Sequence, residues 1–310
     1  MLARIAESCY WIGRHIERCE HSSRYMKTQY FSTLNAPMSQ NKDFALRSIL
    51  FMSGGSFQIQ GDLQENTVWQ KVIFDPNNAD SLLSLVKNIR ESARGIRNVL
   101  SEEFWEAINK WYLGTQNLEA QNFSSDGFFP LIEKMNDHIV SIKWSLHHTF
   151  LRDDVWNFIS LGIYMERAVQ VLRIIRSKIS DSIILSNNGE NQALLQYQWT
   201  TLLMSLEAFS IHNKKNMGVR SRKSIFEILL GHGGFPRSLQ YTALKINRHL
   251  NGISVHPPGH QQVKMDFERL MNDCLDFDDF SDQDKVINLI DKAYNCISDF
   301  HFEIEQLYFK

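Results

Sequence analysis

The sequence predicts an all-α protein in which long antiparallel helices form two interlocked, internally duplicated halves of one bundle-like unit. Three observations lead to this prediction. Apolar residues recur at helical spacing over long stretches, only six prolines and fifteen glycines interrupt the 310 residues, and one charged motif occurs twice. Hydrophobic residues make up 43% of the chain, which is enough to fill a core.

The doubled motif is Gly-x-x-x-Glu-Arg-x-x-x-x-x-Arg. It occurs at residues 13–24 and again at 162–173, so the copies lie 149 residues apart (162 − 13 = 149), close to half the chain. A second match follows in the same order, because the turn-rich segments 73–81 and 230–238 each lead into Ser-Leu and an apolar-periodic stretch. Two matches in the same order favour an internal duplication over chance. The predicted repeats are residues 1–150 and 151–310.

The first helix is predicted over residues 2–32. Its apolar residues are spaced alternately four and three apart from Ile5 to Met26, which is a seam at heptad period. A similar seam in the second repeat predicts a second long helix over 152–181, after a break at its first three residues.

The remaining elements follow from capping residues and apolar spacing. Asp80 or Ser81 is the predicted N-cap of a helix over 80–99, and Ser101 is the predicted N-cap of the helix over 101–113. Only Phe57–Gln60 and Ser182–Leu185 resemble strands, and both are short. A loop is predicted at 115–127 and a turn at 186–189. The other predicted helices are 101–113, 128–150, 191–212, 219–230, 237–250, 261–275 and 283–308.

Composition excludes several classes of protein. A net charge of −2 gives no global field that would attract nucleic acid, and no stretch approaches the roughly 18 apolar residues of a membrane span. The N-terminus lacks the apolar segment of a signal peptide. Four cysteines show no Cys-x-x-Cys spacing, and Cys9 and Cys19 fall on the apolar seam, so we expect buried free thiols in a cytoplasmic protein.

The charged residues of the doubled motif form the candidate site. On the first helix, Glu17, Glu20 and Arg24 follow Gly13 along a line that lies about 100° from the apolar seam, so these side chains border the core. The second copy carries a matching glutamate and two matching arginines. The candidate residues are Arg14, Glu17, Arg18, Glu20, Arg24, Glu166, Arg167 and Arg173, with Arg237 as a secondary candidate.

Two interpretations of these residues remain open. A structural network would place each glutamate beside an arginine where the two repeat helices meet, with glycine allowing a close approach. A functional cleft would use the arginines to bind an anionic group and a glutamate as acid or base. Ile163 and Val169 replace Arg14 and Glu20 in the second copy, so the first copy is the stronger candidate for binding a ligand.

Other chemistry finds little support in the sequence. A di-iron bundle needs Glu-x-x-His pairs, and no histidine here has an acidic residue three positions before it. Glu17 and His21 lack a second such pair to complete a metal site, and Gly231–Gly234 lacks the lysine of a phosphate-binding loop. The acidic run from Asp273 to Asp284 lacks the glycine of a calcium loop. We therefore expect no metal and no cofactor.

The segment Ser8–Glu20 resembles the N-terminal signature of the bacterial alpha-E family, an all-helical family of unknown function. The order and spacing of the supporting stretches extend this resemblance over nearly the whole chain. Two positions depart from the family pattern, since Ile163 and Val169 stand where the second motif usually has an arginine and an acidic residue. The supporting stretches are 81–98, 101–109, 161–167 and 235–239.

The resemblance implies a cytoplasmic bacterial protein encoded beside, or fused to, an ATP-grasp ligase-like protein and a transglutaminase-like peptidase. Our leading hypothesis is therefore a non-catalytic helical partner of an amidoligase system, acting as scaffold, carrier or regulator. One alternative is an enzyme or ligand-binding protein that uses the Glu/Arg cluster of the first helix on an anionic peptide-like metabolite. Another is a general protein-interaction module, and a homo-oligomer stays open.

Overall fold

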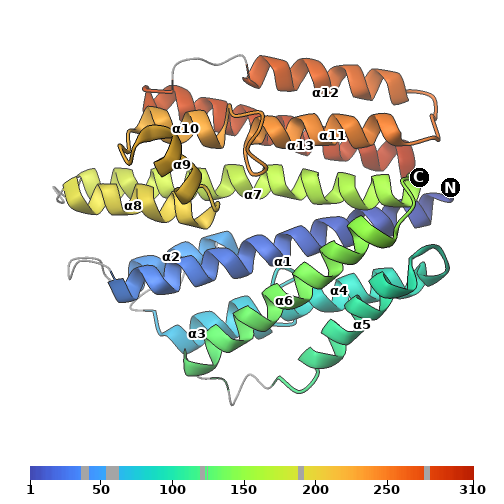
Figure 1. The fold of residues 1–310 in the computed structure, drawn as a ribbon, viewed down its shortest axis with the longest axis horizontal. Coiled ribbons are helices and arrows are strands. Elements are labelled where there is room, and N and C mark those ends of the chain that lie inside the picture. The colour runs from blue at the N-terminus through green and yellow to red at the C-terminus, as the bar shows by residue number, and fades with distance from the viewer. Residues whose placement is uncertain (36–41, 54–62, 119–122, 124, 188–191, 276–279) are drawn as a thin grey trace. The chain divides into compact units, whose positions relative to one another are not determined.

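Helices account for all regular structure in the part of the chain described here, which confirms the all-α prediction (Figure 1). This computed structural model describes residues 1–35, 42–53, 63–118, 123, 125–187, 192–275 and 280–310. Two short elements differ in pitch, the π-helical η1 (Gln70–Phe74) and the 3₁₀ helix η2 (Arg97–Val99). The α-helices are α1 (Ala3–Asn35), α2 (Lys42–Met52), α3 (Glu65–Trp69), α4 (Leu82–Gly95), α5 (Glu102–Thr115), α6 (Ser125–Thr149), α7 (Asp154–Asn187), α8 (Gln192–Ser205), α9 (Phe209–Asn216), α10 (Arg222–Leu229), α11 (Leu239–Gly252), α12 (His260–Leu275) and α13 (Gln283–Tyr308).

One strand-like prediction is wrong. Ser182–Leu185 lies inside α7, which continues to Asn187 and so also takes up the start of the predicted turn at 186–189. The strand preference of four alternating residues is weaker than the gain from extending a helix that already has seven turns. Each added helical residue forms one more backbone hydrogen bond. The other strand-like segment, Phe57–Gln60, lies outside the described residues.

Several helix boundaries differ from prediction. The expected helix 80–99 stops at Gly95 and is followed by η2, and the expected helix 191–212 is two helices, α8 and α9. The break between them lies at Glu207, whose φ of 56° is left-handed and cannot continue an α-helix. The short helices α2 and α3 were not predicted, and α6 begins at Ser125, three residues before its predicted start at 128.

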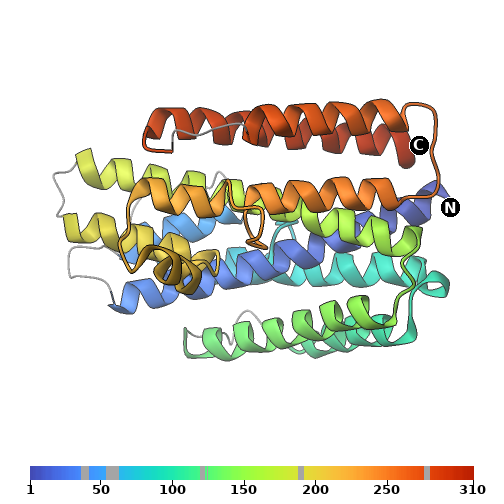
Figure 2. The ribbon, with the colours of Figure 1, turned by 45° about the horizontal axis from the view of Figure 1, so that its top comes forward.

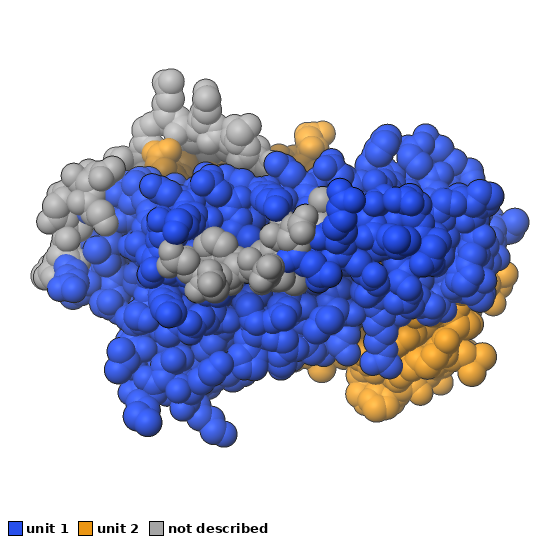
Figure 3. All heavy atoms as spheres, turned by 90° about the horizontal axis from the view of Figure 1, so that it is seen from above, with its two compact units in different colours: residues 1–7, 164–310 blue, residues 8–163 orange. Residues whose placement is uncertain are grey.

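The chain divides into two compact units, coloured separately in Figure 3. Unit 1 comprises residues 1–7 and 164–310, and unit 2 comprises residues 8–163. The long helices α1 and α7 each contribute residues to both units. The division into repeats at 150/151 concerns sequence similarity and stays a prediction.

Unit 2 is organised around α5, which packs against both α4 and α6. The hydroxyls of Ser81 and Ser101 accept hydrogen bonds from backbone N–H groups of the first turns of α4 and α5, so both predicted serine caps are present. Aromatic rings fill the interior at the start of α6, where Trp69 stacks on Phe128 with ring centroids 4.3 Å apart. These contacts fix α6, which carries one of the charged residues discussed below.

In unit 1, α12 and α13 form a helical pair whose packing Figure 2 displays. Asp282 caps α13 by accepting hydrogen bonds from two backbone N–H groups, and Phe267 of α12 meets Phe300 of α13 with centroids 4.3 Å apart. Ser238 caps α11 in the same way as Ser81 caps α4. The predicted boundaries of α13, 283–308, agree with the structure.

Within unit 2, α1 and the first turns of α7 approach so closely that only glycine fits at two positions. A Cβ atom added to Gly13 would lie 2.0 Å from the carbonyl oxygen of Ile159, and one added to Gly162 would lie 2.0 Å from the carbonyl oxygen of Tyr10. Both distances are far below a van der Waals contact, so a side chain at either position would separate the helices.

The two glycine contacts are reciprocal. Gly13 and Gly162 are 149 residues apart, and so are their partners Tyr10 and Ile159 (159 − 10 = 149). Each glycine therefore contacts the residue three positions before the other glycine, as in a two-fold symmetric interface. This exchange of partners is what an internal duplication would produce.

Replacing Gly13 by alanine should lower the free energy of unfolding by at least about 3 kcal/mol, because the new methyl group meets rigid helix backbone rather than a side chain that could move. Gly95→Ala is the matched control, since nothing lies within 4 Å of a Cβ at that helical glycine. It should change stability by no more than about 1 kcal/mol and in the stabilising direction. Chemical denaturation of both variants measures the difference, and equal effects would contradict the close approach.

Candidate functional site

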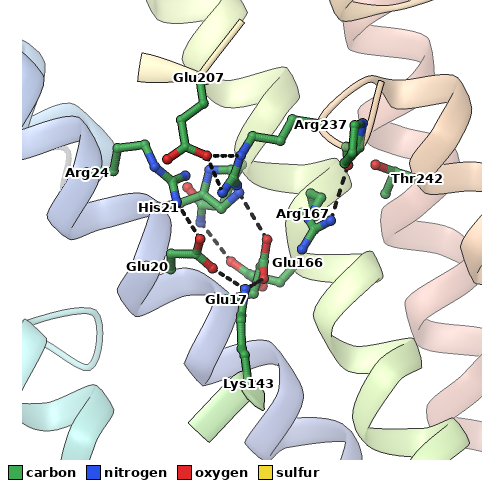
Figure 4. Close-up of polar contacts among 12 residues, drawn as sticks. Glu17, Glu20, His21, Arg24, Lys143, Glu166, Arg167, Glu207, Arg237 and Thr242 are labelled. Atoms are coloured by element: carbon green, nitrogen blue, oxygen red, sulfur yellow. Dashed lines mark hydrogen bonds and ion pairs between the residues drawn. The ribbon is translucent and has the colours of Figure 1, made fainter. Parts of the chain in front are cut away.

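The first copy of the doubled motif holds a cluster of charged residues, which we call the α1 charge cluster: Glu17, Glu20, His21, Arg24 and Lys143 (Figure 4). Lys143 of α6 donates hydrogen bonds to both glutamates, at 2.5 Å from Oε2 of Glu17. His21 Nε2 lies 3.2 Å from Oε1 of Glu17, and Arg24 pairs with Glu20. Both carboxylates of the cluster therefore have cationic partners.

Burial differs across the α1 charge cluster. The side chains of Glu17 and His21 are 0% exposed, whereas that of Lys143 is 21% exposed. The cluster holds two carboxylates, one ammonium and one guanidinium, so its formal charges balance even with a neutral histidine. Such balance is needed because an unpaired charge inside a protein is strongly destabilising.

The two remaining arginines of the first copy reach different neighbours. Arg18 pairs with Asp80 at 2.6 Å, in the loop that leads to the N-cap of α4. Arg14 is buried, and its guanidinium lies over the ring of Trp11, 5.4 Å from the centroid, and 3.4 Å from the hydroxyl of Tyr10. Arg18 thus links α1 to the loop before α4.

The Glu-Arg pair of the second copy lies in unit 1. Glu166 is fully buried and accepts a hydrogen bond of 2.7 Å from Gln170. Arg167 donates to the carbonyl oxygen of Pro236 at 3.2 Å and lies over the ring of Tyr164. Arg173 is half-buried on the same helix.

Arg237, the secondary candidate, forms an ion pair with Glu207. Its Nε and Nη2 atoms lie 2.8 and 2.7 Å from Oε2 of Glu207, the residue with left-handed backbone between α8 and α9. The pair thus ties the loop before α11 to the α8–α9 junction. Figure 4 draws this pair together with the Arg167 contact.

The two copies use their Glu-Arg pairs in the same way. Each glutamate meets the side chain four residues later, His21 in the first copy and Gln170 in the second. Each arginine contacts the loop just before a serine N-cap, since Asp80 directly precedes Ser81 and Pro236 lies two residues before Ser238. The shared role is to attach a long helix to the start of another helix of the same unit.

Sequence reasoning missed the residues that complete these contacts. Lys143 lies 126 residues from Glu17, and Glu207 lies 30 residues from Arg237. Neither pair can therefore be predicted from the spacing of residues along one helix. For Asp80, the local sequence predicts only a role as N-cap. A fully buried lysine was also missed: Lys178 donates to Asp181 at 2.9 Å.

The chemistry open to the α1 charge cluster is restricted. Both carboxylate oxygens of Glu17 lie within hydrogen-bonding distance of a neighbouring side chain, His21 or Lys143, and the carboxylate has no exposed surface. In the described parts of the chain, no three His, Cys, Asp or Glu side chains gather as they would around a metal ion. No helix among the described residues has the length and apolar character to span a membrane.

The cysteines Cys9 and Cys19 are buried and free. Burial, and secondarily the charge of Asp153, raises the pKa of Cys9 to about 12, and burial likewise raises the pKa of Cys19. Both residues therefore match the expectation of buried free thiols. Cys296 is also buried, whereas the side chain of Cys274 lies outside the described residues.

Lys143→Met should destabilise the protein by about 3 kcal/mol or more, because the buried carboxylate of Glu17 loses its cation. The matched control is Lys27→Met, which removes another lysine–glutamate pair, to Glu133, whose side chains are 34% and 45% exposed. That change should cost less than about 1 kcal/mol. Free energies of unfolding in denaturant measure both effects. If Lys143→Met lowers the free energy of unfolding by no more than Lys27→Met does, the result contradicts a buried network.

Iodoacetamide at pH 8 should leave Cys9 unmodified in the native protein, because a thiol with a pKa about four units above the pH is ionised in only about one molecule in ten thousand. Full labelling should follow unfolding in urea. Peptide mass spectrometry reads both states, and rapid stoichiometric labelling of Cys9 in the native protein would refute the buried assignment.

Comparison with known proteins gives a family and distant relatives. Uncharacterised proteins of Mycobacterium bovis and Mycobacterium tuberculosis are each 19% identical to this chain, over 81% of its length and 30% of theirs. The chain thus spans less than a third of the length of these relatives. No solved structure matches it.

The family model is Alpha-E, described as a predicted alpha-helical domain with a conserved ER motif, and it matches residues 1–309. The Glu-Arg pairs at 17–18 and 166–167, in the two copies of the doubled motif, fit that description. The observed all-helical fold fits it as well. The chain therefore belongs to the Alpha-E family.

Proposed function

We propose that this protein is a non-catalytic helical partner of a cytoplasmic ATP-grasp amidoligase system, in which it acts as a scaffold, carrier or regulator. The observation that carries the non-catalytic part is the state of Glu17, whose carboxylate is 0% exposed and contacts His21 and Lys143 through both oxygens. A general base has to reach a substrate proton at hydrogen-bond distance. Glu17 has no surface from which to do so.

The second copy supports the same conclusion. Glu166 is fully buried beside Gln170, and Arg167 makes a contact with a backbone carbonyl oxygen within its own unit. Both Glu-Arg pairs therefore serve the packing of helices. A motif that is retained for packing needs no substrate to explain it.

The length of the relatives supports a role beside other domains. The mycobacterial proteins extend well beyond the region that matches this chain, which covers 30% of them. A domain that occurs inside longer proteins often works through contacts with neighbouring domains. The amidoligase and peptide-processing context itself comes from the family resemblance, which implies genes or fusions of ATP-grasp and transglutaminase-like proteins.

Exposed apolar side chains add support for protein contacts. Val140 and Trp144 lie one turn apart on α6 and are 67% and 57% exposed. Large aromatic side chains are enriched in protein interfaces, where they contribute a disproportionate share of the binding energy.

The experiment is co-purification of this protein with the ATP-grasp ligase encoded beside it. A stoichiometric complex on size-exclusion chromatography is expected, because a scaffold or regulator has to bind the enzyme. Separate elution of the two proteins at micromolar concentration, with the ligase fully active alone, would contradict the proposal.

Glu17→Gln separates the partner role from the rival role in catalysis or ligand binding. If the residue is structural, the variant loses stability because the α1 charge cluster keeps two cations but only the one carboxylate of Glu20, and the folded fraction still binds the ligase. If the residue acts on a substrate, the variant loses activity of the combined system while its melting temperature changes by only a few degrees. Thermal unfolding and product formation, measured on the same preparation, distinguish these outcomes.

A further inference from the structure

A row of basic residues follows one face of α4 and the short helix η2 after it. We call this row the basic ridge: Lys87, Arg90, Arg94 and Arg97. The spacing of three and four residues places Lys87, Arg90 and Arg94 on one side of α4. Arg97 follows in η2, and its guanidinium lies by the ring of Trp105, as does that of Arg90. Lys87, Arg94 and Arg97 are exposed, and Arg90 is half-buried. The ridge lies wholly within unit 2 and takes no part in the α1 charge cluster.

Aromatic rings of α5 hold two of the guanidinium groups in place. Arg90 lies over Tyr112, 5.0 Å from the ring centroid, and 6.0 Å from that of Trp105. Arg97 lies 5.3 Å from the centroid of Trp105. A guanidinium stacked on a ring loses less conformational freedom when it binds an anion, so the aromatic support prepares the ridge for binding.

The ridge already binds one carboxylate, that of Glu91. Arg90 donates to its Oε1 at 2.5 Å and Arg94 to its Oε2 at 2.6 Å. The hydrogen bond from Arg90, followed by the charges of Arg94, Arg90 and Lys87, lowers the pKa of Glu91 below its usual value. The positive field of the ridge therefore favours carboxylates, and one carboxylate leaves most of its four cationic charges uncompensated.

The surroundings favour an acidic protein segment over a nucleic acid. The chain as a whole carries a charge of −2, and α5 begins with the exposed glutamates Glu102, Glu103 and Glu106. A nucleic acid needs an extended basic surface that neutralises many phosphates, and the four side chains of the ridge provide only a short one. A short acidic segment needs only a few basic side chains and a place for each carboxylate.

We propose that the basic ridge is a docking surface for an acidic segment of a partner protein, whose carboxylates pair with Arg94, Arg97 and Lys87 and compete with Glu91 for Arg90. This inference rests on the proposed function, in which the chain acts by binding another protein. It adds the face that binds and the chemistry of the segment that is bound.

The test measures fluorescence anisotropy of a labelled ten-residue glutamate peptide with the full-length protein, at about 0.1 M salt, where the Debye length is about 10 Å. The double variant Arg94→Glu/Arg97→Glu should bind the peptide about tenfold more weakly, because two favourable charge pairs become repulsive. The matched control is Lys214→Glu/Lys215→Glu, which makes the same change of charge on exposed lysines of α9 and should bind nearly as well as the wild type. Circular dichroism checks that each variant is folded.

A third variant tests the competition directly. Glu91→Gln removes the resident carboxylate and should tighten peptide binding about threefold. If both double variants weaken binding equally, or if Glu91→Gln has no effect, the ridge is not the binding surface. A single-stranded ten-mer of deoxythymidine that binds the ridge more tightly than the peptide would overturn the choice of partner.

Co-purification with the ligase separates this inference from the proposed function. A wild-type complex that Arg94→Glu/Arg97→Glu disrupts supports both. A complex that the double variant leaves intact overturns the ridge as the docking surface and retains the partner role. Ridge-dependent peptide binding without any ligase complex retains the ridge and overturns the proposed partner.

Discussion

The close contact between α1 and the first turns of α7 is a packing constraint that only glycine satisfies at two positions. At Gly13 and Gly162 the two helix backbones meet without intervening side chains, and each glycine faces the carbonyl group of the residue three positions before the other glycine. Each motif glutamate lies one helical turn after its glycine, on the side that faces the protein interior. Glu17 and Glu166 are both fully buried, and a buried carboxylate requires the basic and amide partners that contact them.

The two adjacent residues of each Glu-Arg pair make different contacts. Because neighbouring residues on a helix point about 100° apart, Glu17 faces the interior while Arg18 reaches outward to Asp80 at the start of α4. The second copy repeats this division, with Arg167 contacting the loop before α11. A conserved motif in this family thus has a physical explanation that involves no substrate. On the outer surface, α4 and α5 carry charged and aromatic side chains that contact one another.

Much of the fold follows from the sequence. Heptad spacing predicts α1 and α7, and serine caps locate the starts of α4 and α5 because their signals are local. The helices α2 and α3 are short and gain their stability from packing, which local patterns do not reveal. The candidate site was predicted only in part. Glu17, Glu20 and Arg24 follow from spacing along one helix, but Lys143 joins them through tertiary packing across 126 residues, which sequence spacing does not encode.

The two glycines belong to one contact between the same two helices, α1 and α7. A double-mutant cycle with Gly13→Ala and Gly162→Ala measures this most directly, through free energies of unfolding in denaturant. Since either methyl group already forces α1 and α7 apart, the second should cost less in the presence of the first, with a coupling of about 1 kcal/mol or more. Additive costs within about 0.5 kcal/mol would mean that the two positions are independent and would contradict the account.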